Sequence, residues 1–141
     1  MGGQRLARDI RQALVDRGDP DYESARAAVL CDELTPPRHP EMIVRAASAD
    51  DVREAIALAC SRGLKVSVRA GGPGRYGAPL RDGGLLIDVS RLRRHSVADG
   101  SATVEPGVTG QDLIRALAAW EHAFPVAHRG PVPVGGFVMG G

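Results

Sequence analysis

Apolar residues recur along part of this chain at the spacing of an amphipathic helix. Within the segment that follows Ser48, they lie at i, i+3, i+4, i+7 and i+8. These residues are Val52, Ala55, Ile56, Ala59 and Cys60. Ser48, followed three residues later by Asp51, has the pattern of a capping box, and Gly63 suits a left-handed C-cap. The pattern predicts a helix between Ser48 and Gly63 whose apolar side, including Cys60, is buried.

Short apolar runs predict strands on both sides of this helix. Met42–Arg45 precedes the helix and Leu64–Arg69 follows it at once. Leu85–Val89 is a third run, and Ser101–Glu105 is a fourth, after a turn at residues 99–100. Strand, helix and strand together form a βαβ unit. Ligands of such units tend to bind at the carboxyl ends of the strands.

The two ends of the chain have weaker patterns. Near the start, apolar residues share one helical face and predict a first helix that Gly18 and Pro20 end; they are Leu6, Ile10, Ala13 and Leu14. Thr109, with Asp112 at the box position, predicts a later helix that ends near residues 121–122. Its expected buried residues are Leu113, Ile114, Leu117 and Trp120. Residues 124–126 are expected to be briefly extended, and prolines and glycines predict loop from residue 131 onward.

Composition narrows the class of protein. The chain has 141 residues and a net charge of +1, so no nucleic acid or acidic membrane is expected as a partner. No apolar run approaches the about 20 residues of a membrane span, and no secretory signal is visible, which predicts a cytoplasmic protein. Cys31 and Cys60 predict no disulfide framework. Lys65 is the only lysine beside many arginines, which suggests a bacterial source with a GC-rich genome.

A glycine-rich stretch joins the second and third predicted strands. It begins at Arg69 and continues Ala70-Gly71-Gly72-Pro73-Gly74-Arg75-Tyr76. Small residues expose backbone N–H groups with no Cβ in the way, and two arginines add charge-assisted donors, so the stretch suits a phosphate group. A nucleotide cofactor is the first hypothesis, and a surface turn without a ligand is the alternative.

Three of these glycines also have the spacing G-x-G-x-x-G of a Rossmann dinucleotide site; they are Gly72, Gly74 and Gly77. Such a site needs a helix that begins at the loop and an acidic residue about 20 residues further on. Pro79 and the glycines after it disfavour that helix, and no acidic residue has the required position. A Rossmann site is therefore disfavoured. The histidines have no metal-ligand spacing, so no metal site is expected.

Seven segments, in this order and at this spacing, are similar to one known family. They are Pro37–Pro40, Ile43–Arg45, Ser48–Arg62, Val68–Tyr76, Asp82–Leu92, Val104–Thr109 and Val134–Gly141. Together they resemble the FAD-linked oxidoreductase superfamily with a PCMH-type FAD-binding domain, and its berberine-bridge-enzyme-like branch in particular. In that family a stretch like residues 19–30 has little regular structure.

The resemblance implies an α+β fold, the N-terminal portion of a PCMH-type FAD-binding domain. Residues 1–36 would form an N-terminal helix and linker, and residues 37–141 the FAD-binding part. In a complete relative the flavin accepts a hydride from an alcohol, sugar or amine carbon. Two glycine-rich loops would hold the FAD pyrophosphate through Arg69, Ala70, Gly71, Gly72, Pro73, Gly74, Arg75, Tyr76, Pro131, Val134, Gly135, Gly136, Gly140 and Gly141.

Two positions depart from the family's pattern. Members commonly attach the flavin through a His where this chain has Pro73, and through a Cys where it has Arg129. Neither side chain forms such a bond, so FAD is expected to bind non-covalently. The chain ends within the second glycine loop and offers no candidate catalytic base, so a truncation is expected, with a substrate only if a C-terminal half is supplied. The alternative is a non-catalytic nucleotide-binding protein or inactive remnant that self-associates through exposed apolar surface.

Overall fold

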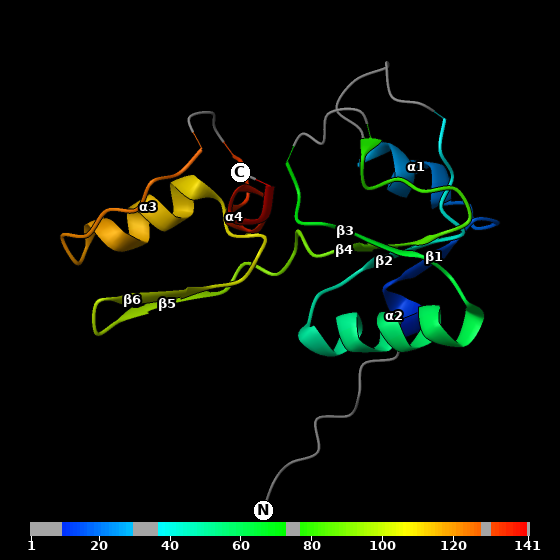
Figure 1. Ribbon diagram of the computed structural model, residues 1–141, viewed down its shortest axis with the longest axis horizontal. Helices are drawn as coiled ribbons and strands as arrows, with labels where there is room; N and C mark the ends of the chain where they lie inside the picture. The colour runs from blue at the N-terminus through cyan, green and yellow to red at the C-terminus, as the bar shows by residue number, and fades with distance from the viewer. Residues whose placement is uncertain (1–9, 30–36, 73–76, 128–130, 141) are drawn as a thin grey trace, which may run out of the picture.

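The computed structural model describes residues 10–29, 37–72, 77–127 and 131–140. Its elements form two lobes that lie side by side (Figure 1). The larger lobe is a four-stranded sheet with a helix on each face, and the smaller lobe is a β-hairpin with two further helices. The glycine-rich stretch begins where the sheet of the larger lobe faces the smaller lobe.

The sheet of the larger lobe contains β1 (Leu14–Asp16), β2 (Met42–Arg45), β3 (Val66–Arg69) and β4 (Leu85–Asp88). Their order is β1-β2-β4-β3, with β4 parallel to both of its neighbours and β1 antiparallel to β2. Helix α2 (Ala49–Arg62) connects β2 to β3. This arrangement confirms the predicted βαβ unit, in which β4 lies between the two strands that the helix joins.

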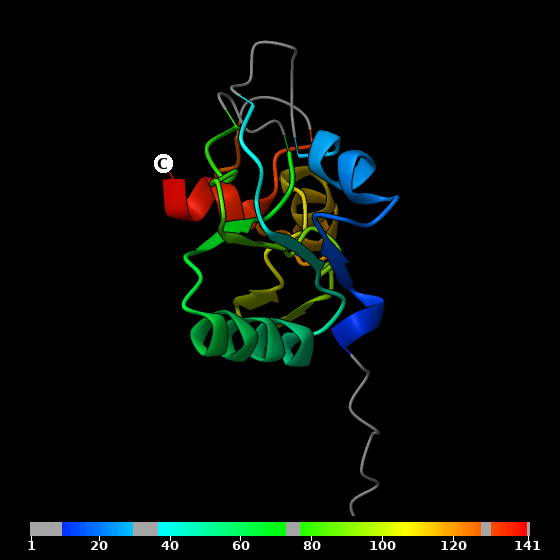
Figure 2. The ribbon, with the colours of Figure 1, turned by 90° about the vertical axis from the view of Figure 1, so that its right-hand side faces the viewer.

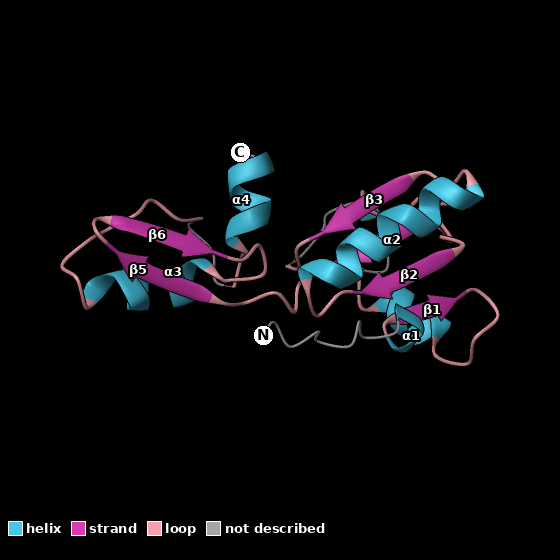
Figure 3. Ribbon diagram, turned by 90° about the horizontal axis from the view of Figure 1, so that it is seen from below, coloured by secondary structure: helices cyan, strands magenta, loops and turns pink. Residues whose placement is uncertain are grey.

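Side chains from β2 and β4 alternate between the two faces of the sheet. Met42 and Leu85, which are register partners, pack toward α2, whereas the next pair, Ile43 and Leu86, packs toward α1 (Tyr22–Ala27). Figures 2 and 3 show the two helices on opposite faces of the sheet. Because both faces are covered, the central strands are apolar runs without polar alternation.

The caps of α2 are those that its sequence predicts. The Ser48 hydroxyl accepts the Asp51 N–H at 3.1 Å, and the Asp51 carboxylate accepts the N–H groups of Ala47 and Ser48 at 2.7 and 3.1 Å. Gly63 ends the helix with φ 64°. The predicted burial of Cys60 is wrong: Cys60 is exposed, because only the narrower face through Ala55 and Ala59 meets the sheet.

The region before β2 differs from the sequence analysis in two ways: it lacks the predicted first helix over its described part, and it contains a helix within residues 19–30. The predicted first helix is wrong over its described part, where Ile10–Gln12 is a 3-10 turn (η1) and Leu14–Asp16 is β1. Leu14 and Val15 pack into the cores on opposite faces of the sheet, so strand pairing outweighs the local helical pattern. Helix α1 lies where little regular structure was expected, and the Tyr22 hydroxyl fastens it by donating to the Pro40 carbonyl at 2.6 Å.

The smaller lobe contains the hairpin β5 (His95–Ala98) and β6 (Ser101–Val104), then α3 (Gly110–Ala118). Strand β5 was not predicted. Thr109 caps α3 by accepting the Asp112 N–H at 3.2 Å, as expected. Only part of the predicted helix face is buried: Leu113 and Leu117 are, but Ile114 and Trp120 are 46% and 53% exposed. The helix also ends earlier than predicted, and residues 124–126 form no strand.

The last described element is helix α4 (Val134–Gly140), which corrects the expected loop. Tertiary contacts hold its first turn in place despite its glycines. The Val134 N–H donates to the Val108 carbonyl at 2.7 Å, and the Gly135 N–H donates to the Pro106 carbonyl at 3.1 Å. The Val134 side chain is buried among Val108 and Leu113 of the smaller lobe. These contacts outweigh the low helix propensity of glycine.

Candidate functional site

The carboxyl ends of β3 and β4 meet at Arg69 and Asp88, which are register partners. The Arg69 Nη1 donates to Asp88 Oδ2 at 2.8 Å, and the two side chains are only 15% and 13% exposed. The second carboxylate oxygen, Asp88 Oδ1, accepts the Ser90 N–H at 2.9 Å. A largely buried ion pair therefore joins the residue before the glycine stretch to the turn after β4.

The first residues of the glycine stretch turn sharply over this ion pair. Gly71 and Gly72 have φ +110° and +74°, a left-handed backbone that L side chains rarely adopt. A Cβ on Gly71 would lie 3.1 Å from Ser90 Cβ, and one on Gly72 would lie 2.8 Å from Pro133 Cδ. Glycine is therefore required at both positions, because the turn rests directly on Ser90 and Pro133.

A cavity of about 310 Å³ lies between this turn and the segment that leads into α4. Its walls include Ala70, the two glycines and Pro133, and Gly136 from the first turn of α4. A Cβ built on Gly136 meets no atom within 4 Å, so the missing side chain leaves the backbone open toward the cavity. A ligand can approach the chain closely at this glycine.

The structure gathers some of the predicted cofactor residues and separates others. Arg69, Ala70, Gly71, Gly72 and Gly136 line the cavity. Val134 is buried in the smaller lobe, Gly135 packs on Pro106, Pro131 is exposed and Gly140 lies near the end of α4. The predictions for Pro73, Gly74, Arg75, Tyr76 and Gly141, and for Arg129, lie outside the described residues.

Three residues of this site were missed from the sequence: Asp88, Ser90 and Pro133. A signal for the first two exists, because Asp88-Val89-Ser90 ends an apolar run that was predicted to be a strand. Polar residues at the carboxyl end of a strand next to a glycine loop belong to the edge where ligands bind. Pro133 has no such signal, since only the fold brings it against Gly72.

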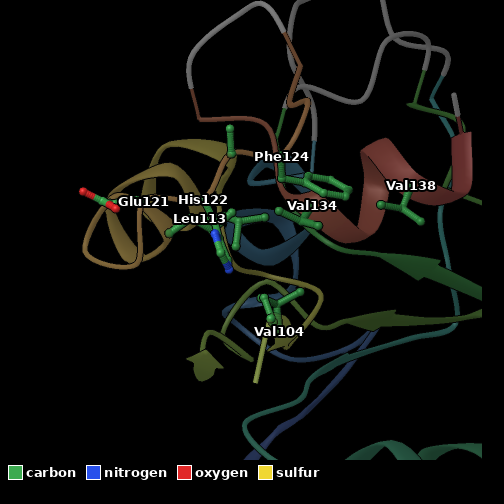
Figure 4. Close-up of a pocket in the computed structure, with 11 residues that line it drawn as sticks. Val104, Leu113, Glu121, His122, Phe124, Val134 and Val138 are labelled. Atoms are coloured by element: carbon green, nitrogen blue, oxygen red, sulfur yellow. The ribbon is translucent and has the colours of Figure 1, made fainter. Parts of the chain in front are cut away.

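A second, larger hollow of about 570 Å³ lies in the smaller lobe (Figure 4). It is lined mainly by apolar side chains from β6, α3 and α4, and Phe124, Val134 and Val138 point toward one another there. Phe124 is 43% and Val138 60% exposed. The glycine turn of the first cavity does not reach this apolar groove, and α4 lies between the sheet and α3 (Figure 1). The groove suits an apolar cover rather than a phosphate.

The cavity fits one end of a phosphate-containing cofactor on two observations. Gly136 lines the cavity without a side chain, and the space beside its Cα is open. The Nε–H of Arg69 is buried and has no hydrogen-bond partner among the described residues, which leaves a donor to be satisfied at the same edge. Left-handed glycines, a largely buried arginine and the carboxyl ends of parallel strands are the features expected of a nucleotide-binding class of site.

Comparison with known proteins identifies the family to which the chain belongs. The sequence profile of the FAD binding domain family matches residues 40–141, and the chain belongs to that family. The chain is 32% identical over 123 residues to the FAD-linked oxidoreductase nodO of Hypoxylon pulicicidum, which covers 86% of this chain and 27% of that protein. The fold is the α+β fold of the N-terminal portion of a PCMH-type FAD-binding domain, as expected.

Solved structures agree on the fold. The chain superposes on wild-type Phl p 4.0202, a grass-pollen glucose dehydrogenase, with a TM-score of 0.77 and 20% identity. The match covers 89% of this chain and 28% of the pollen protein. It superposes on the BBE-like 1 protein of Physcomitrella patens with a TM-score of 0.72 and 23% identity, covering 90% and 29%. The chain thus spans little more than a quarter of the length of these relatives.

Three further findings concern the expectations drawn from composition. Fungal proteins lead the similar sequences, so the comparisons do not support the suggested bacterial source. Within the described ranges, no helix is long and apolar enough to cross a bilayer. In the same part of the chain, no group of three or more His, Cys, Asp or Glu side chains is arranged to hold a metal ion. The cytoplasmic location stays a prediction.

Proposed function

We propose that this chain binds FAD non-covalently, with the pyrophosphate in the cavity between Ala70–Gly72 and Gly136. The observation that carries the proposal is the cavity itself: a left-handed glycine turn at the carboxyl edge of parallel strands, facing an open glycine on α4. Membership of the FAD binding domain family supports FAD over other nucleotides. Proline at position 73 and arginine at position 129, in place of the family's His and Cys, support non-covalent binding.

We further propose that the chain serves an FAD-dependent oxidoreductase that oxidises an alcohol, sugar or amine carbon. When bound, the flavin supplies the redox chemistry as a hydride acceptor. The residues of this chain bind and orient it: the glycine turn and Gly136 hold the pyrophosphate side, while Asp88 holds Arg69 at their edge. Relatives such as the (R)-6-hydroxynicotine oxidase of Paenarthrobacter nicotinovorans and the glucooligosaccharide oxidase of Sarocladium strictum support this range of substrates.

A titration of the whole chain with FAD tests the binding. The quenching of flavin fluorescence should saturate in the micromolar range or below, and acid precipitation should release all of the flavin into the supernatant. Flavin that stays with the precipitated protein would contradict the non-covalent attachment. A folded chain that leaves the flavin fluorescence unchanged would contradict FAD binding itself.

The alternative function is a non-catalytic protein that self-associates, and the apolar groove of the smaller lobe favours it. Val138 and Phe124 leave apolar surface exposed there, and such patches promote association. Light scattering over a range of protein concentrations would then show a dimer that Val138→Glu converts to a monomer. Ile56→Glu is the control, because Ile56 is 46% exposed on the other lobe. A monomeric wild-type chain that binds FAD would exclude self-association and an inactive remnant.

A further inference from the structure

Asp88 binds one residue in each of two segments beside the cavity, the end of β3 and the turn after β4, and it uses one carboxylate oxygen for each. Oδ2 accepts from Arg69, the residue directly before the glycine turn, and Oδ1 accepts from the Ser90 N–H, in the turn after β4. The carboxylate is itself only 13% exposed. One buried side chain therefore fixes the start of the glycine turn relative to the residue on which that turn rests.

Ser90 packs against the glycine turn and against Gly107, next to the residue that binds the start of α4 on the other side of the cavity. The Cβ position of Gly71 lies 3.1 Å from Ser90 Cβ, and that of Gly107 lies 2.5 Å from the Ser90 carbonyl oxygen. The neighbouring Pro106 carbonyl accepts the N–H of Gly135 at the start of α4. Because close-packed contacts transmit displacement, a shift of Ser90 moves both the glycine turn and the first turn of α4.

Arg69 is held by the same carboxylate and is not a free cation. Its charge is already paired with Asp88 at 2.8 Å, so little of it remains to attract an anion. Apart from its Nε–H, which has no partner among the described residues, its contribution toward a bound phosphate is therefore geometric: the paired guanidinium holds the end of β3 beside the end of β4. The residue that sets this geometry is Asp88.

We propose that Asp88 is a positioning residue for the anion-binding turn. Its carboxylate holds Arg69 and Ser90 so that Gly71 and Gly72 keep the left-handed conformation that borders the cavity. This inference rests on the proposed function in one respect, since the FAD pyrophosphate is the ligand that the turn serves. The conformational part of the inference concerns the chain alone and can be measured without a ligand.

Amide hydrogen exchange of the whole chain tests the conformational part. In Asp88→Asn, the amide offers one acceptor oxygen for two donors. Exchange should therefore accelerate about tenfold or more at Ser90, whose N–H donates to Asp88, and at Val89, whose N–H donates to the Arg69 carbonyl. Exchange in β2 should change less than about twofold. Asp82→Asn is the matched control, because Asp82 precedes the same strand at its other end and accepts the His39 N–H at 2.7 Å. Equal acceleration throughout the sheet would show a purely structural role and overturn the proposal, as would unchanged exchange at both Val89 and Ser90.

Arg69→Lys is the second variant for the exchange experiment, to be used if Asp88→Asn does not fold. Lysine keeps the charge balance but lacks the planar fork that matches a carboxylate. Exchange should then accelerate at Val89, whose N–H donates to the carbonyl of residue 69, and stay slow at Ser90, whose bond to Asp88 Oδ1 is intact. Unchanged exchange at Val89 in this variant would overturn the proposal.

FAD affinity provides the second readout. The FAD Kd should rise about tenfold or more in Asp88→Asn and less than about twofold in Asp82→Asn, at protein concentrations and temperatures where both are folded. Equal affinities would overturn the positioning role. If the wild-type chain binds no FAD, the proposed function fails, and the exchange pattern alone then decides the role of Asp88.

Discussion

Gly72→Ala is the substitution whose cost follows most directly from the structure. Gly72 has φ +74°, and a left-handed backbone costs a residue with a Cβ about 1–2 kcal/mol. The new Cβ would lie 2.8 Å from Pro133 Cδ, and overpacking of this kind costs about 1–3 kcal/mol. Reduced freedom of the unfolded chain returns about 0.4–1 kcal/mol. We expect the free energy of unfolding to fall by about 2–4 kcal/mol.

Gly83→Ala separates the two costs. Gly83 has φ +65°, but a Cβ there meets no atom within 4 Å, so this variant carries the backbone cost alone, about 1 kcal/mol. Urea unfolding followed by circular dichroism and by the fluorescence of Trp120 gives both values by linear extrapolation. The Pro133 contact predicts a larger loss in Gly72→Ala. Equal losses in the two variants would refute the packing of the glycine turn against Pro133.

Three other predictions test local features. Ser48→Ala removes the N-cap of α2 and should lower stability by about 1 kcal/mol in the same urea assay; an unchanged midpoint would contradict the cap. Hydrogen bonds from the Arg94 N–H and side chain lower the pKa of Glu105 below 4.5, so its stabilisation is present above pH 4.5 and is lost as the pH falls further. Glu105→Gln should therefore reduce stability at neutral pH and weaken its decline in acid, and parallel pH profiles would argue against the pair. In a Cys31→Ser background, the exposed Cys60 should react with a thiol reagent without unfolding; a thiol that reacts only in urea would be buried.

The parts of the fold that were predicted are those whose signals are local. Helix α2 carries its N-cap, its apolar face and its C-cap within one segment, and the strands beside it are short apolar runs. Strand β1 and helix α4 depend on distant partners. Leu14 pairs with Val44, and Val134 is held by the Val108 carbonyl. Neither contact leaves a local signal, so the local pattern gave a helix for the first and a loop for the second.

Burial was predicted less well than helix position. Periodicity places Ile114 and Trp120 on the apolar side of α3, yet both are about half exposed, because the hairpin and α4 cover only the part of the helix around Leu113 and Leu117. The width of a buried face depends on the neighbours that cover it. No helix sequence contains that information by itself.

The candidate site also has a part that the sequence predicts and a part that it does not. The glycine stretch was recognisable because small residues after a strand expose backbone N–H groups, which predicts a turn suited to an anion. The contacts that hold the turn were not recognisable. Ser90 and Pro133 lie far from Gly71 and Gly72 in the sequence, and only the parallel pairing of β3 with β4 and the course of the chain into α4 bring them together.

The central claim is that FAD lies between the glycine turn and α4, and Gly136→Leu tests it most directly. The position is open, and leucine favours a helix more than glycine does, so the variant should be at least as stable as the wild-type chain while its side chain fills the cavity. Gly18→Leu is the control, because a Cβ there also meets no atom within 4 Å and the site is distant. The account predicts an FAD Kd raised about tenfold or more by Gly136→Leu alone. Wild-type affinity in a folded Gly136→Leu chain would place the cofactor elsewhere and contradict the account.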